Sequence, residues 1–97
     1  MPVYALLEFR FKPEAVDQAP DAVSRTLAVT RQFDGCQRID VLVDNEDPTR
    51  YLLVEVWESL EHDAAYRQFR ASPGGASELG PLLAAPPVLM YYSHTSI

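Results

Sequence analysis

Several kinds of residue are scarce in this chain of 97 residues, and each scarcity excludes a class of protein. Cys36 is the single cysteine, so the chain can form neither an internal disulfide nor a metal site built on several thiolates. Lys12 is the single lysine, and a net charge of -6 leaves little cationic surface for phosphates or anionic lipids. We therefore expect neither nucleic acid nor a membrane as a partner.

Long apolar runs are also missing. No stretch approaches the roughly 20 residues that a membrane-spanning helix needs. The first residues alternate and lack a basic start, which is not typical of a secretory signal peptide. These features predict a cytoplasmic protein. The length predicts a single domain over residues 1–97, and a composition of 47% hydrophobic and 23% charged residues is that of a globular protein.

Four segments alternate apolar and polar residues with the period of a β-strand. They are residues 3–11, 36–43, 50–57 and 88–95. Between the second and the third, residues 44–49 contain Asp, Asn and Pro, which favour tight turns. These two strands are therefore expected to form a hairpin.

Two segments repeat apolar residues at three- and four-residue steps, as amphipathic helices do. They are residues 17–33 and 59–71. Asp17 and Ser59 stand where N-cap residues are expected, and Gly35 follows the first helix, where glycine relieves left-handed strain. A short additional helix is expected within residues 76–85.

The order strand, helix, strand, strand, helix, strand predicts an α+β fold of the ferredoxin-like βαββαβ type. All four strands would form one antiparallel sheet, with the first and third strands in the middle. Both helices would cover the same face of that sheet, because each crossover connection is right-handed.

The third predicted strand is apolar on both of its sides. Residues 51–57 are apolar at six of seven positions, so only Glu55 interrupts the pattern. A strand of this kind is normally buried on both faces, but the helices can cover only one. We predict a homodimer with sheets face to face, burying roughly 1,000 Å² or more. The alternative is that the C-terminal segment of the same chain folds across the second face.

Three short segments carry a likeness to a known family. They are residues 35–42 (GCQRIDVL), 47–50 (DPTR) and 54–59 (VEVWES). Together with the order of elements, they resemble the antibiotic biosynthesis monooxygenase family of dimeric α/β-barrel proteins. The resemblance implies a dimer with a pocket in each subunit between sheet and helices. Enzymes of that family oxidise polyphenols or hydroquinones with molecular oxygen and without metal, flavin or haem. No cofactor is therefore expected, and oxygen would be the co-substrate.

The sequence departs from the family's pattern at two points. Members often carry a histidine nine residues after the tryptophan that ends the third strand, and Tyr66 stands there in this chain. Haem-degrading relatives need an asparagine on the first strand and a histidine on the second helix. The single asparagine, Asn45, lies in a predicted turn, and His62 lies too close to the helix start. We therefore reject haem degradation.

Glu55 and Trp57 are candidates because both point to the same side of the third strand. The family resemblance implies that Trp57 lines an aromatic-binding pocket; the alternative is a core tryptophan. A carboxylate in an apolar strand needs a partner. Glu55 would act as the general base for a phenolic proton. The alternative is an ion pair with Arg10, with Arg38 or with a residue across the dimer interface.

His62, Tyr66 and Phe69 share one face of the second predicted helix. His62 is a candidate proton acceptor, and Tyr66 a candidate for catalysis and for holding an aromatic ring. The alternative places Tyr66 and Phe69 in the core and leaves His62 solvated. Arg10 is the candidate for steadying the substrate anion.

The remaining polar residues give weaker signals. We expect contact with a partner subunit from Tyr91, Tyr92 and His94. The alternative is that these residues reach a pocket. The spacing of His62 and His94 does not support a metal site. Cys36, at the start of a strand, is interpreted as a small buried thiol and not as a nucleophile.

The sequence therefore leaves three hypotheses. The first is a cofactor-independent monooxygenase acting on a polyphenol, quinol or anthrone. The second is a non-catalytic or stress-associated dimer that binds a small aromatic ligand. The third is an isomerase or lyase that uses the same base.

Overall fold

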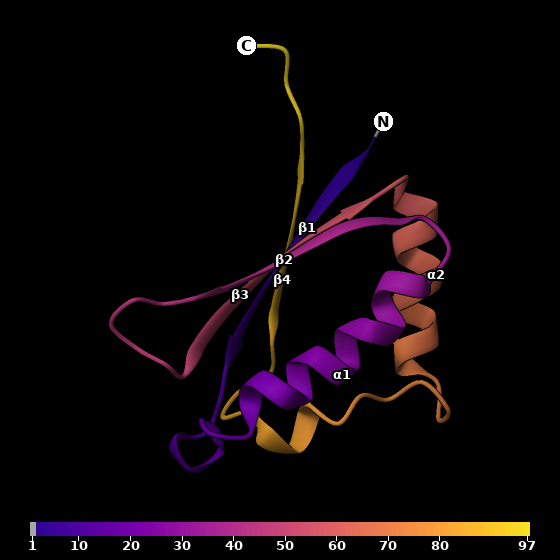
Figure 1. Ribbon diagram of the computed structural model, residues 1–97. Helices are drawn as coiled ribbons and strands as arrows, with labels where there is room; N and C mark the ends of the chain where they lie inside the picture. The colour runs from indigo at the N-terminus through magenta and orange to yellow at the C-terminus, as the bar shows by residue number, and fades with distance from the viewer. Residues whose placement is uncertain (1) are drawn as a thin grey trace.

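Residues 2–97, which the computed structural model describes, form two layers: a sheet of four strands and two helices on one of its faces (Figure 1). The elements follow one another as β1 (Val3–Arg10), η1 (Pro13–Ala15), α1 (Ala19–Gln32), β2 (Cys36–Val43), β3 (Arg50–Trp57), α2 (Leu60–Ala71), η2 (Gly80–Leu82) and β4 (Val88–Ser93). This is the predicted α+β, ferredoxin-like arrangement.

The strand order in the sheet is β2-β3-β1-β4, and all neighbouring strands run antiparallel. The prediction that β1 and β3 lie in the middle is therefore confirmed. The register places Ala5 of β1 and Ile39 of β2 on either side of Glu55 in β3. Glu55 thus lies at the centre of the sheet.

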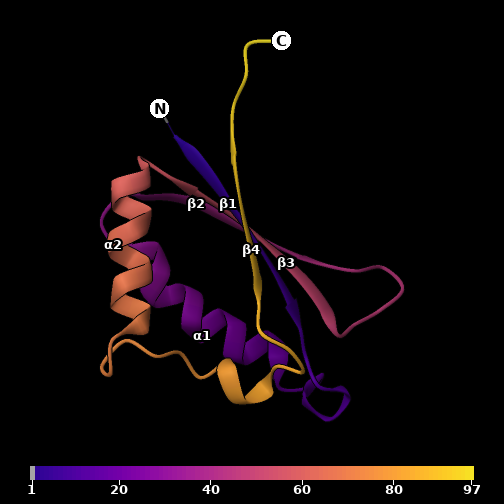
Figure 2. The same ribbon diagram turned by 180° about the vertical axis from the view of Figure 1, so that it is seen from behind.

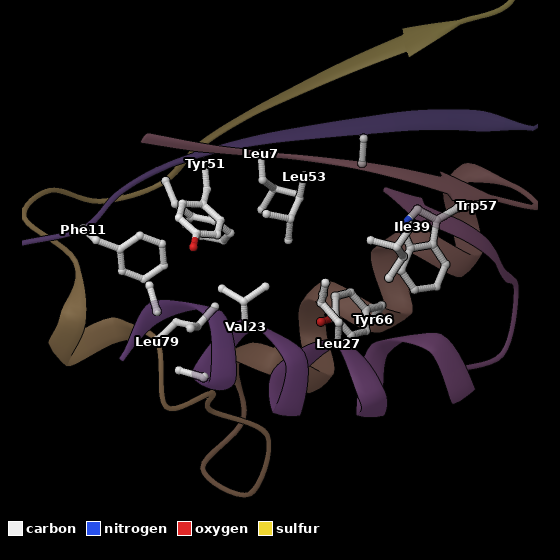
Figure 3. Packing of buried hydrophobic residues seen from close by; sticks show 14 of the residues in the cluster. Leu7, Phe11, Val23, Leu27, Ile39, Tyr51, Leu53, Trp57, Tyr66 and Leu79 are labelled. Atoms are coloured by element: carbon white, nitrogen blue, oxygen red, sulfur yellow. The ribbon is translucent and has the colours of Figure 1, made fainter. Parts of the chain in front are cut away.

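Both helices lie on the same side of the sheet, and the view from behind agrees (Figures 1 and 2). Figure 3 shows Leu7, Leu53 and Tyr51 pointing from the strands toward Val23 and Leu27 of α1. The core fills the space between these layers. Its largest fully buried side chains are Trp57, Phe11, Leu27, Leu53 and Thr30.

The helix starts follow the capping chemistry only in part. The Ser59 hydroxyl accepts a hydrogen bond of 3.2 Å from the backbone N–H of His62, so the predicted cap of α2 is confirmed. For α1 the prediction of Asp17 is wrong, because the cap residue is Gln18 and its side chain makes no capping bond. Pro20 sets this start, since proline fits only the first turn of a helix.

The short helix expected within residues 76–85 forms only in reduced form. Only the short 3-10 helix η2 forms there, and the rest is irregular. Gly80 and Pro81 interrupt the apolar pattern, because glycine costs backbone entropy and proline lacks an N–H. Leu79, Leu82 and Leu83 nevertheless pack against the core on the helix side of the sheet.

The second face of the sheet is left uncovered by residues 2–97. We call it the open face. Its apolar members include Leu42, Val88 and Tyr92, with exposed fractions of 50%, 51% and 56%. The chain after Ser93 extends away beyond the strands and does not cross the open face (Figures 1 and 2). The alternative that the C-terminal segment covers this face is therefore wrong.

Among the helices of residues 2–97, none has the length and hydrophobicity of a membrane-spanning segment.

Candidate functional site

A cavity of about 330 Å³ lies between the sheet and the helices. Strands β1 and β3, both helices and the segment between α2 and β4 supply its walls. Most of the lining is apolar, including Leu7, Phe9, Leu27, Leu53, Leu79 and Leu83. The polar part is Thr26, Glu55, Tyr66, Arg67, Arg70 and Ser77. A mostly apolar pocket with a few convergent polar groups is the usual form of a small-molecule site.

Glu55 is the buried carboxylate of this cavity, with an exposed fraction of 2%. The alternation of β3 turns it toward the helices, beside Ala5, which is too small to cover it. Trp57 Nε1 donates to Glu55 Oε1 at 3.0 Å, and Arg67 Nη2 donates to the same oxygen at 2.7 Å. Within residues 2–97 the second oxygen, Oε2, accepts no hydrogen bond. Glu55 is thus fixed through one oxygen, while the other remains available.

Arg67 holds two carboxylates at once. Its Nε donates to Asp63 Oδ1 at 3.1 Å, and its Nη2 reaches both Asp63 and Glu55. The Tyr91 hydroxyl from β4 donates to the other oxygen of Asp63. Burial alone would lower the pKa of Arg67, but the charges of Glu55 and Asp63 outweigh it and raise this pKa above its ordinary value. Two carboxylates around one guanidinium leave this cluster with one net negative charge.

Arg70 lies one turn further along α2 and has neutral partners. It donates from Nε to the Tyr66 hydroxyl at 2.7 Å and from Nη2 to the Thr26 carbonyl at 2.9 Å. It also reaches Thr30 Oγ1 and the Gly75 carbonyl, both at 3.2 Å. No carboxylate in residues 2–97 pairs with it. These bonds join α2 to α1 and leave a cation without a counter-charge on the cavity wall.

Thr26 adds an unusual feature beside Arg70. Its hydroxyl Oγ1 is buried and has no hydrogen-bond partner within residues 2–97. Leaving such a group unpaired costs about 1–3 kcal/mol.

Trp57 is fully buried, with an exposed fraction of 0%, and lies behind the cavity wall. Its ring lies beside that of Tyr66 (Figure 3), with 4.9 Å between the two centroids. The centroid of the Phe33 ring is 6.3 Å away. The indole therefore supports two wall residues, through stacking on Tyr66 and through the hydrogen bond to Glu55. Trp57 is thus a core tryptophan that does not line this cavity, as the alternative had it.

Tyr66 does lie on the cavity wall, as a pocket role requires. Its hydroxyl is 2.7 Å from Thr30 Oγ1 and accepts from Arg70. Its exposed fraction of 4% shows that it is also a core residue, so both interpretations of Tyr66 describe the same placement.

His62 lies outside this cavity. Its Nδ1 hydrogen-bonds Ser59 Oγ at 2.7 Å, and its Nε2 lies 3.6 Å from Asp34 and 3.7 Å from Glu58. Its ring packs on Gly35, where φ is +89° and a Cβ would come within 2.3 Å of the imidazole. His62 thus joins the start of α2 to the turn before β2 and does not face Glu55.

Arg10 lies on the open face, where its guanidinium is 3.8 Å from Asp47. It is therefore on the opposite side of the sheet from the cavity. Arg38 pairs with its neighbour Asp40 at 2.9 Å. The expectation that either arginine pairs with Glu55 is wrong. Arg10 is paired with Arg50 of β3 and Arg38 with Val56, and these positions point away from the helices, whereas Glu55 points toward them.

Sequence reasoning missed the arginines of α2. The available signal was spacing: Asp63 with Arg67, and Tyr66 with Arg70, are each four residues apart, which places both pairs on one side of the helix.

The C-terminal aromatic residues divide between the two faces. Tyr91 bonds Asp63 on the helix side, whereas Tyr92 is exposed on the open face and His94 lies 5.7 Å from the Tyr4 ring. No group of three or more His, Cys, Asp or Glu side chains in residues 2–97 is arranged to hold a metal ion.

Comparison with known proteins agrees with this architecture. The family model described as antibiotic biosynthesis monooxygenase matches residues 2–78. No functionally curated protein matches the chain.

Solved structures match almost the whole chain. A protein of Nitrosomonas europaea, provisionally titled an antibiotic biosynthesis monooxygenase, is 17% identical with a TM-score of 0.82 over 98% of this chain and 91% of its own. Rv0793 of Mycobacterium tuberculosis is 21% identical, with a TM-score of 0.78 over 100% and 98%.

The SnoaB protein of Streptomyces nogalater is titled a cofactor-independent oxygenase. A mutant form of it is 19% identical, with a TM-score of 0.79 over 99% of this chain and 95% of its own. Identities this low show a shared fold and not a shared substrate. The family model, by contrast, spans most of the sequence, and this chain therefore belongs to the antibiotic biosynthesis monooxygenase family.

Proposed function

We propose that the protein is a cofactor-independent monooxygenase that oxidises a quinol, polyphenol or anthrone with molecular oxygen. One observation carries the proposal: a buried carboxylate, Glu55, is held through one oxygen and has its other oxygen available on the wall of a largely apolar cavity. Membership of the family supports the same activity.

Glu55 acts as the general base in this proposal. Its free Oε2 takes the phenolic proton, and Arg67 and Trp57 keep the carboxylate oriented. The apolar walls keep water away from the electron-rich anion that results. That anion reduces oxygen; one oxygen atom enters a ring carbon as a carbonyl, and the other leaves with the two displaced hydrogens as water.

The other proposed roles follow the placement of the side chains. Tyr66 offers its ring and hydroxyl to the aromatic ligand. Trp57 acts through Tyr66 and Glu55. His62 and Arg10 have no role at this cavity, because neither lies on its wall. The absence of a cofactor is part of the proposal, as is a cytoplasmic location for the single domain.

Assembly as a homodimer is also proposed, through the open face. The supporting observation is the exposure of Leu42, Val88 and Tyr92 on a face that this chain leaves uncovered. A second copy related by a twofold axis would bury them without a further partner.

The second candidate is a non-catalytic dimer that binds a small aromatic ligand. The hydrogen bonds of Arg70 and Tyr66 to α1 favour it, because a buried network that joins two helices is explained by stability alone. An isomerase or lyase using Glu55 would leave the oxygen content of its product unchanged.

Oxygen uptake with a panel of hydroquinones and anthrones tests the proposal, with mass spectrometry of products formed under isotope-labelled oxygen. Wild type should incorporate one labelled atom and exceed the uncatalysed rate. Glu55→Gln should lose this excess, whereas Glu8→Gln, which changes a carboxylate on the open face, should keep it. If members of the panel bind but none of them incorporates labelled oxygen, the result favours the second candidate.

A further inference from the structure

The exposed part of the cavity wall lies in one segment of the chain. Among the residues that line the cavity, the exposed ones are Ala76, Gly80 and Pro87, and all three belong to the connection between α2 and β4. The lining residues on the strands and on both helices are buried or half-buried. A molecule that comes from the solvent therefore reaches the cavity past this connection.

We call residues 76–81 the strap. Both of its flanks are fixed to the rest of the fold. Before the strap, the Gly75 carbonyl accepts a hydrogen bond of 3.2 Å from Arg70 Nη1. After it, the Leu82 carbonyl accepts one of 2.9 Å from the backbone N–H of Lys12. The strap is thus a short span between two anchored ends, on the way from α2 to β4 (Figures 1 and 2).

The strap itself is held by few polar contacts. In the part of the chain that the structure describes, residues 76–78 take part in no backbone hydrogen bond. Arg25 Nη2 of α1 pairs with Glu78 Oε1 at 2.6 Å, but both side chains are exposed. An exposed ion pair favours the closed strap by at most about fivefold. Segments with so few bonds to the rest of a fold open locally at low cost.

One buried side chain provides the main contact of the strap. Leu79 is 4% exposed, lines the cavity and belongs to the core cluster (Figure 3). Its neighbours Glu78 and Gly80 are both exposed. Burial of a leucine favours the closed state by about 10- to 100-fold. Since little else holds the strap, its opening depends mainly on Leu79.

We propose that the strap is the gate of the cavity and that Leu79 holds it closed. The strap moves away from the core between its anchored ends to admit a ligand. When Leu79 returns, it restores the apolar wall and excludes water from the ligand. The inference concerns access to the cavity and holds whichever reaction takes place there.

A buried thiol measures this access without knowledge of the ligand. Thr26→Cys, combined with Cys36→Ser, places the single thiol of the chain on the cavity wall. The Thr26 hydroxyl has no hydrogen-bond partner in residues 2–97, so the replacement breaks no bond of that side chain. The probe is dithiodipyridine, a neutral aromatic disulfide whose reaction with a thiol is followed by absorbance.

Leu79→Ala should accelerate this reaction by about tenfold or more, because the contact that closes the strap is lost. Ile39→Ala is the matched control, since it removes as many atoms from a buried site that does not line the cavity. Urea denaturation should show comparable losses of stability in the two variants, but Ile39→Ala should leave the rate unchanged.

Equal acceleration by Leu79→Ala and Ile39→Ala would show that the thiol reacts only after global unfolding, and would overturn the inference. An unchanged rate in Leu79→Ala would overturn it as well. Should Leu79→Ala fail to fold, Glu78→Gln decides, because it changes only an exposed ion pair. It should accelerate the reaction by about two- to fivefold, and an unchanged rate would contradict the gate.

The gate and the proposed oxidation fail separately, because the thiol reaction involves neither a quinol nor oxygen. Access controlled by Leu79 without any oxygen uptake would contradict the monooxygenase and leave the gate intact. Oxygen uptake, together with a thiol reaction that is independent of Leu79, would do the reverse.

Discussion

The two faces of the sheet are built from the same strands, yet they differ in what completes them. On the helix side, Leu53 and Trp57 of β3 are sealed by side chains of this chain, and Glu55 finds Arg67. On the open face, Leu52 and Val54 of the same strand remain partly exposed. The comparison places the cavity on the covered face, and the proposed dimer interface lies on the open one.

The charges follow the same division. Arg10, Arg38 and Arg50 form ion pairs between largely exposed groups, which contribute little to stability. Arg67 instead lies between two carboxylates whose side chains are only 3% exposed. Removing a cation should therefore have very different consequences on the two faces.

The largest effect is expected from Arg67→Met, which leaves Glu55 and Asp63 buried without their cation. The free energy of unfolding should fall by about 3–5 kcal/mol. Urea denaturation measures it, with Arg10→Met on the open face as control, where a loss of at most about 1 kcal/mol is expected. Equal losses in both variants would contradict the division between the faces.

The second prediction concerns the open face. Val54→Asp places a charge in the proposed dimer interface and should convert the dimer to monomers in sedimentation velocity. Val29→Asp is the matched control, because Val29 lies on α1 with an exposed fraction of 47%. A wild-type monomer, or a dimer unaffected by Val54→Asp, would show that the open face is not the interface.

A smaller effect is expected from Tyr91→Phe, which removes the donor to Asp63. The loss in the free energy of unfolding should be about 1.5–3 kcal/mol, the range for a hydrogen bond to a charged group. Tyr92→Phe on the open face should change stability by less in the same urea experiment. A larger loss from Tyr92→Phe would indicate that the bond to Asp63 contributes little.

The Tyr91 bond also has a pH dependence. Burial, followed by the contact with Asp63, raises the pKa of Tyr91 above its ordinary value. A raised pKa of this kind gives stability that is present below the pKa of the unfolded chain and lost as the pH rises through the pKa of the folded protein. Wild type should therefore lose stability at alkaline pH, and Tyr91→Phe should lose less of it.

The smallest expected effect concerns Cys36. Burial raises the pKa of this thiol, and the charge of Glu55 adds to the shift. Less thiolate is then present near pH 8, and thiolate is the reacting species. Reaction with a disulfide reagent at that pH should be slower in native protein than in urea. Equal rates would show that the fold does not protect Cys36.

Much of the fold could be predicted because its signals are local. The alternation of residues 3–11, 36–43 and 50–57 predicted which side the strand residues face, including Glu55 and Trp57. It fails only at the start of β2, where the register shifts between Cys36 and Arg38. The irregular stretch 76–87 could not be predicted in the same way. Its leucines pack on the core although no regular helix forms, so tertiary contact decides its path.

The site was predictable only in part. Glu55, Tyr66 and Trp57 come together because strand and helix periodicity place them on facing surfaces. The partners of Glu55 could not be identified from spacing, since the approach of α2 to β3 decides that Arg67, and not Arg10, reaches it. His62 was misplaced for a similar reason: its position in the first turn of α2 directs it to Gly35.

The rate of oxygen uptake by Glu55→Gln, set against that of His62→Gln, tests the central claim most directly. Both variants remove a candidate base, but only Glu55 lies on the wall of the helix-side cavity. With a quinol that wild type oxidises, the account predicts a fall of about 10²-fold or more in Glu55→Gln and near wild-type uptake in His62→Gln. Full activity in Glu55→Gln, or a fall confined to His62→Gln, would contradict it.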